Sequence, residues 1–169
     1  PPTPETTEPE PSPTPEIGDP VPLDSFDLTG LTELGYVHNP DLLSENLTQW
    51  QSPGCKVQAL VAPTPGSGDD AADSSAAFGM LGPEFQDLEE NGWVRLPLTE
   101  GGTLTMSVRT GTFDMNGTLV PVDIAARSVG EVHTLFVITH TCSEDAPNPT
   151  TLEDVIPRII LNGVLNPDA

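Results

Sequence analysis

The sequence predicts an α+β fold in which helices pack on an antiparallel sheet. The longest run rich in β-branched and aromatic residues is 131–142, and both of its faces carry apolar side chains, as in a central covered strand. Two alternating segments, residues 103–112 and 118–128, precede it and are joined at Asn116-Gly117, a dipeptide that favours a β-hairpin. The best helix pattern of the chain follows it. These observations predict a meander with a helix packed on it.

The earlier part of the domain contributes further elements. A hairpin is expected from residues 47–51 and 56–62, with its turn at Pro53-Gly54. Helical segments are expected at residues 41–45, from Asp73 or Ser74 toward Leu81, and at residues 84–90.

The terminal helix is predicted after Thr150 or Thr151, either of which would cap it, with Glu153 and Asp154 in its first turn. Its apolar stripe comprises Leu152, Val155, Ile156, Ile159, Ile160 and Val164. We expect this stripe to pack on the sheet face formed by Val120, Val122, Ile124 and Phe136.

Residues 1–22 differ in composition from the rest, with nine prolines among Thr, Ser and Glu. Such a tract buries too little apolar surface to fold, so we expect a disordered tether followed by a single domain at residues 23–169. The alternative is a ligand for a proline-recognising domain. Because the chain opens inside this tract, we expect a targeting segment upstream.

Charge limits the class of partner. The chain has 26 acidic and 5 basic residues, a formal net charge of −21. Such a surface repels phosphate backbones and anionic lipids, so we expect cationic or neutral partners and no nucleic acid. No run approaches the roughly 18 apolar residues of a membrane span, so membrane association would require an upstream anchor.

The two cysteines, Cys55 and Cys142, are too few for a structural zinc site. They lie at the start of an early strand and at the end of the last one, where neighbouring antiparallel strands would bring them together. We therefore expect one disulfide and an oxidising, extracytoplasmic compartment. Two buried free thiols are the alternative.

No catalytic, cofactor-binding or metal-binding motif is present in the sequence. His133 and His140 are seven residues apart and would face opposite sides of one straight strand. A cluster of buried, mutually bonded His, Asp and Ser would instead favour a hydrolase. Asn46 and Asn116 match the N-glycosylation pattern, and the sequence does not decide whether they are used.

One candidate polar patch is predicted on a face of the meander, from Arg109, Asp123, Arg127, Glu131 and His133. It would consist of cross-strand ion pairs, or it would bind a ligand or partner.

The layout of residues 104–165 resembles a known family, with Thr134-Leu-Phe-Val-Ile-Thr followed by Leu152-Glu-Asp-Val-Ile-Pro-Arg-Ile-Ile. Together with the acidic Pro/Thr tract, it looks like the Mog1/PsbP-like α/β/α sandwich of exported proline-rich proteins and LpqN-like lipoproteins of actinobacteria. The resemblance implies a non-enzymatic accessory or binding protein of the cell envelope, secreted or lipid-anchored at the cell surface. It transfers no site residue.

Three functions are therefore expected, in decreasing order. The first is a non-catalytic, tethered envelope domain that binds another envelope component. The second is a carrier of a small apolar ligand such as a lipid, with a pocket between the terminal helix and the sheet at Phe136, Ile138, Val122 and Ile156. The third is a hydrolase with an unrecognised site.

Overall fold

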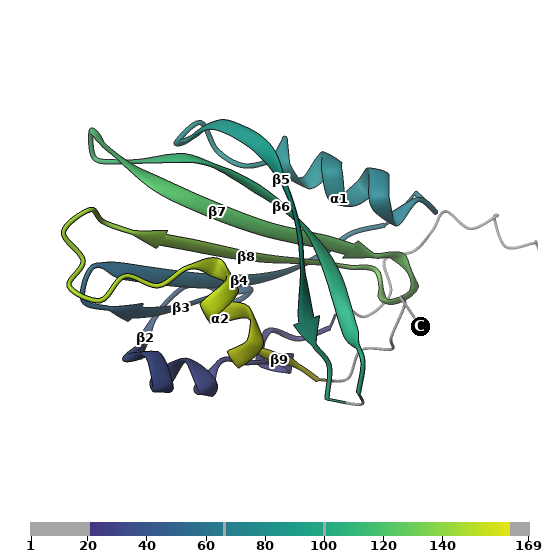
Figure 1. Ribbon diagram of the computed structural model, residues 1–169. Coiled ribbons are helices and arrows are strands. Elements are labelled where there is room, and N and C mark those ends of the chain that lie inside the picture. The colour runs from purple at the N-terminus through teal and green to yellow at the C-terminus, as the bar shows by residue number, and fades with distance from the viewer. Residues whose placement is uncertain (1–20, 66, 100, 163–169) are drawn as a thin grey trace, which may run out of the picture.

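The computed structural model describes residues 21–65, 67–99 and 101–162 (Figure 1). These residues form an α+β protein with a seven-stranded antiparallel sheet in the order β2-β3-β4-β8-β7-β6-β5. The predicted central strand is confirmed over Thr134–Cys142, which form β8, the middle strand of the seven. The first three residues predicted for it, 131–133, lie in a 3-10 helix and a turn before the strand. The predicted tether at residues 1–22 lies almost wholly outside the described residues.

The strands are β1 Phe26–Asp27, β2 Val37–Ser44, β3 Leu47–Ser52, β4 Cys55–Pro63, β5 Phe85–Pro97, β6 Thr103–Met115, β7 Thr118–Val129, β8 Thr134–Cys142 and β9 Ile160–Leu161. The α-helices are α1 Asp70–Phe78 and α2 Leu152–Val155, and the 3-10 helices are η1 Leu23–Ser25, η2 Thr29–Leu34, η3 Gly130–Val132 and η4 Ile156–Arg158. β1 and β9 form a separate two-stranded sheet. Both predicted hairpins, β3–β4 and β6–β7, are present.

β8 is covered on both faces, as its sequence predicts. Phe136 and Ile138 belong to a large core that also contains Ala125, Val57 and the C-terminal apolar residues. Leu135 and Val137 face the other way, into a smaller core beneath α1. We call this cluster the α1 core, and it consists of Ala77, Phe78, Val122, Ile124, Ala126, Leu135 and Val137. The sheet therefore separates two apolar layers, each closed by a different set of segments.

Two predicted helical segments are strands instead. Residues 84–90 fall largely in β5, which pairs with β6 through two register shifts, between Gln86 and Glu89 and between Glu90 and Trp93. Each shift breaks the two-residue alternation that identifies a strand in a sequence, and positive φ at Asp87 and Gly92 accommodates the irregular backbone. Residues 41–44 likewise belong to β2.

The predicted middle helix exists but begins earlier. Asp69 caps it by accepting a hydrogen bond from the Ala72 amide at 3.0 Å. It ends at Phe78, because the chain turns at Gly79. Its inner face presents Ala77 and Phe78 to the α1 core.

The terminal helix is much shorter than predicted. Of the two predicted caps, Thr151 is the one that caps the helix, in a capping box with Asp154, but α2 ends at Val155. Pro157 falls in the following 3-10 turn, after which the chain is extended at Ile159 and enters β9. Pro157 has no amide hydrogen to bond to the carbonyl four residues earlier, so the apolar stripe does not continue as one regular α-helix. The predicted stripe residue Val164 lies outside the described residues.

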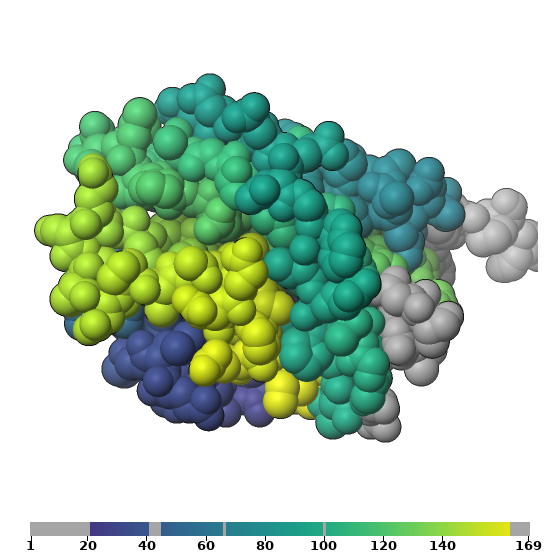
Figure 2. Space-filling view, in the orientation of Figure 1, coloured from purple at the N-terminus to yellow at the C-terminus, as the bar shows by residue number. Residues whose placement is uncertain are grey.

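This segment also packs on a different face from the one predicted. The register places Ala125 opposite Ile138, and Ile124 opposite Thr139. Val122 and Ile124 therefore face α1, whereas α2 and η4 pack with Phe136 and Ile138. Figure 2 shows the yellow C-terminal segment lying between the dark-blue N-terminal segment and the teal strands β5 and β6.

Cys55 and Cys142 form the predicted disulfide, directly opposite one another on β4 and β8, with 4.1 Å between their Cα atoms. A disulfide of this kind indicates an oxidising, extracytoplasmic setting. Among the described helices, none is long and apolar enough to cross a membrane.

Candidate ligand-binding site

A pocket of about 520 Å³ lies between the N-terminal segment and the β2–β3 hairpin. We call it the N-terminal pocket, and it is lined by Leu23, Asp24, Phe26, Asp27, Leu28, Thr29, His38, Thr48, Trp50 and Asn162. Ten residues from η1, β1, η2, β2, β3 and the end of β9 thus converge on it.

One wall is the N-terminal segment, which two buried side chains fix to the sheet. Phe26 packs edge-on against Phe136, with ring centroids 5.8 Å apart, and Leu28 is also buried in the large core. β1 is further held by pairing Phe26 with Leu161 and Asp27 with Ile160 of β9. The wall is therefore anchored by both packing and main-chain hydrogen bonds.

Asp27 starts the η2 turn within this wall. Its carboxylate accepts hydrogen bonds from the Thr29 hydroxyl at 2.6 Å and from the Thr29 amide at 3.0 Å. The hydrogen bond from the hydroxyl has the larger effect, and together the two lower the pKa of Asp27 below its ordinary value of 3.8. Asp27 therefore keeps its negative charge at the pocket rim to lower pH than an ordinary aspartate does.

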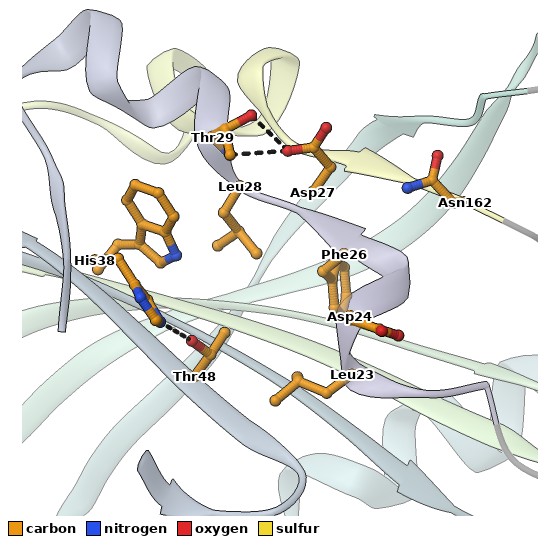
Figure 3. A pocket seen from close by; sticks show the side chains of 10 residues that line it. Leu23, Asp24, Phe26, Asp27, Leu28, Thr29, His38, Thr48 and Asn162 are labelled. Carbon is orange, nitrogen blue, oxygen red and sulfur yellow. Dashed lines mark hydrogen bonds between the residues drawn. The ribbon is translucent and has the colours of Figure 1, made fainter. Parts of the chain in front are cut away.

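The opposite wall comes from the β2–β3 hairpin. The Nε2 atom of His38 lies 3.1 Å from the hydroxyl of Thr48, and its ring centroid lies 5.3 Å from that of Trp50. Figure 3 shows the side chains of Leu23 and Leu28 facing the His38–Thr48 pair across the space. Apolar groups and a small polar pair therefore meet around one cavity.

A second pocket, of about 340 Å³, lies at the end of the sheet that carries the β3–β4 turn. We call it the Lys56 pocket, and it is lined by Gln51, Ser52, Gly54, Cys55, Lys56, Met115, Val120, Thr141 and Ser143. It contains the single lysine of the chain and shares no lining residue with the N-terminal pocket.

The structure divides the predicted polar patch among several places. Arg109 packs over the Phe78 ring at 4.6 Å and donates to the Ser75 hydroxyl, so it lies against α1. Asp123 faces the other side of the sheet, because its neighbour Ile124 is the residue paired with Arg109.

The remaining three residues of the patch lie near η3. Arg127 donates to the Thr105 carbonyl at 2.9 Å and lies 3.9 Å from the Asp70 carboxylate. Glu131 is in η3, and His133 follows it with a positive φ of 48°. His133 is thus at a turn and precedes the strand that carries His140.

A chain of polar side chains that the sequence analysis did not identify lies beside the disulfide. The Nδ1 atom of His140 is 3.5 Å from the Asp123 carboxylate, and its Nε2 atom is 2.9 Å from the hydroxyl of Thr150. The same Thr150 hydroxyl lies 2.9 Å from the hydroxyl of Tyr36. Tyr36 and Thr150 are 114 residues apart, so only the fold shows that they meet.

Asp123, His140 and Thr150 have the connectivity of an acid–base–nucleophile triad. However, the Thr150 hydroxyl is shared with Tyr36, His140 is only 4% exposed, and the Cys142 sulfur lies 3.6 Å from Nε2. These contacts occupy the groups that a triad would present to a substrate. The chain of hydrogen bonds instead fastens the segment leading to α2 onto the sheet.

Within the described ranges, no group of three or more His, Cys, Asp or Glu residues is arranged to hold a metal ion. No protein-family model matches the chain, and no curated protein sequence matches it significantly. The functional interpretation therefore rests on the two pockets and on the polar contacts around them.

Proposed function

We propose that the chain is a non-catalytic, extracytoplasmic binding domain whose ligand occupies the N-terminal pocket. The domain is either secreted or held at the cell surface by an upstream lipid anchor. The Pro/Thr/Glu tract acts as a spacer between that surface and the domain. The domain binds another component of the envelope. The fold is a variant of the Mog1/PsbP-like α/β/α sandwich. The disulfide and the acidic composition support this setting.

The observation that carries the proposal is the cavity itself. Its volume of about 520 Å³ lies within the roughly 300–1,000 Å³ of small-molecule sites. Leu23, Phe26 and Leu28 give it apolar walls, while His38 and Thr48 supply a polar pair. Such a site accepts a small ligand, or a protruding apolar side chain of a partner protein.

The alternative lipid carrier, with its pocket beneath the terminal helix, has less support. Val155, Ile156 and Ile159 are buried in the same core as Phe136, so side chains fill that region. Val122, predicted to line the same pocket, faces α1 instead. An apolar ligand is better accommodated at the N-terminal segment.

Binding of the neutral fluorescent probe N-phenyl-1-naphthylamine tests the proposal. Leu23→Trp adds volume at the half-buried wall of the pocket and should abolish the fluorescence increase that the unmodified protein gives. Leu119→Trp, at an exposed position outside both pockets, is the matched control and should leave it unchanged. Binding that is equal in both variants, or absent from the unmodified protein, would contradict the assignment of the site.

A further inference from the structure

We infer that the ligand of the N-terminal pocket carries a positive charge on an apolar body, as in an alkylammonium group. This inference rests on the proposed function and adds the chemical class of the ligand. It follows from the sign of the charges around the cavity, the aromatic wall, and the positions of the cations of the described domain.

The charges at the pocket have one sign. Asp24 and Asp27 both line it, and no Lys or Arg is among its lining residues. Asp24 is exposed and Asp27 half-buried, so both side chains are accessible from solvent. A cation that reaches the rim therefore gains attraction without first displacing a protein cation.

The arginines of the domain are engaged elsewhere. Arg158 lies 3.5 Å from Glu33 and donates to the Asp154 carbonyl at 2.9 Å. Arg95 stacks on Trp93 at 4.4 Å, and Arg109 lies over Phe78. The remaining arginine, Arg127, lies 3.9 Å from Asp70 at the start of α1, so the described arginines all have partners away from the pocket.

The walls suit the rest of such a ligand. Leu23 and Leu28 face the cavity and provide an apolar surface for an alkyl chain (Figure 3). Trp50 also lines the cavity, and indole rings attract cations more strongly than other aromatic side chains do. An anion would instead meet two carboxylates and the field of a chain with a net charge of −21.

Three probes that share an eight-carbon chain separate charge from apolar contact: octylamine, octanol and octanoate. Binding is measured by calorimetry and by Trp50 fluorescence in a Trp93→Phe background, which leaves Trp50 as the single tryptophan. At neutral pH and low salt we expect octylammonium to bind about 4- to 25-fold more tightly than octanol, since each of the two partly exposed carboxylates contributes a factor of about 2–5. Octanoate should bind least, and added salt should weaken octylammonium alone.

Asp24→Asn should weaken octylammonium about 2- to 5-fold and leave octanol unchanged. Lys56→Gln, in the other pocket, is the control and should change neither. Equal affinity for octylammonium and octanol would overturn the charge assignment while leaving the pocket as a binding site. Failure of all three probes, or loss of binding in Lys56→Gln, would overturn both the ligand class and the proposed site.

Discussion

Ile159 and Ile160 are adjacent isoleucines that should differ sharply in their contribution to stability. Ile159 is 0% exposed in the large core, whereas Ile160 is 39% exposed on β9. Ile159→Ala removes three buried carbons, about 2.4 kcal/mol of transfer free energy, and leaves a cavity, so it should cost about 2–5 kcal/mol. Ile160→Ala should cost about 0.5 kcal/mol, as surface changes do.

Urea denaturation of the two variants measures this difference directly, and thermal unfolding provides a second measurement. A difference of about 2 kcal/mol corresponds to roughly 4–8 °C in melting temperature for a domain of this size. Similar losses for the two variants, or a larger loss for Ile160→Ala, would refute the reasoning, because a one-residue shift of β9 against β1 exchanges the two faces.

Three further predictions concern the region around the disulfide and the pocket wall. Peptide mapping without reduction should recover Cys55 linked to Cys142, and removing the bond should cost about 4–5 kcal/mol, since it closes a loop of 87 residues; two alkylatable thiols in freshly purified protein would contradict it. Burial raises the pKa of Tyr36, the single tyrosine, above 10.0, so tyrosinate absorbance should appear at a higher pH in the folded protein than in the unfolded chain. The stability that Tyr36 contributes below pH 10.0 should be lost as the pH rises through its folded-state pKa. Thr150→Val should raise that pKa further because it removes a hydrogen bond that lowers it, and an unchanged titration would argue against the Tyr36–Thr150 contact. Asp27→Asn should remove a contribution to stability that is present above pH 3.8 and lost as the pH falls through the lowered pKa, and an identical acid transition in the variant would disprove it.

Local patterns predicted the parts of the fold that local chemistry determines. Alternation and the Asn116-Gly117 dipeptide identified the β6–β7 hairpin, and the pair Thr150-Thr151 marked the start of α2 to within one residue. β5 was misassigned because its two register shifts disrupt alternation. The length of α2 was overestimated because the apolar spacing continues past Pro157 although the helix does not.

The candidate site could not be predicted because it depends on segments distant in sequence. Leu23 and Asn162 lie near opposite ends of the described chain, and the pairing of β1 with β9 brings them to one cavity. That pairing consists of two residues on each side, too short for a recognisable strand pattern. Phe26 and Leu28 are core residues that also support the pocket wall, and only the fold shows this second role.

The division of the charged residues shows that strand register, more than composition, decides which charged side chains meet. Within β7, Asp123 and Ile124 point to opposite faces, so a single register assignment sends Asp123 toward His140 and places Arg109 of β6 on the α1 side. An assignment shifted by one residue would reunite Arg109 with Asp123 but would bury the charges of one face and expose Ile124. Since the apolar residues of β7 fix the register, they also prevent the predicted charge patch. The acidic rim of the N-terminal pocket does not depend on the register of β7, because Asp24 lies in η1 and Asp27 in β1, outside the seven-stranded sheet.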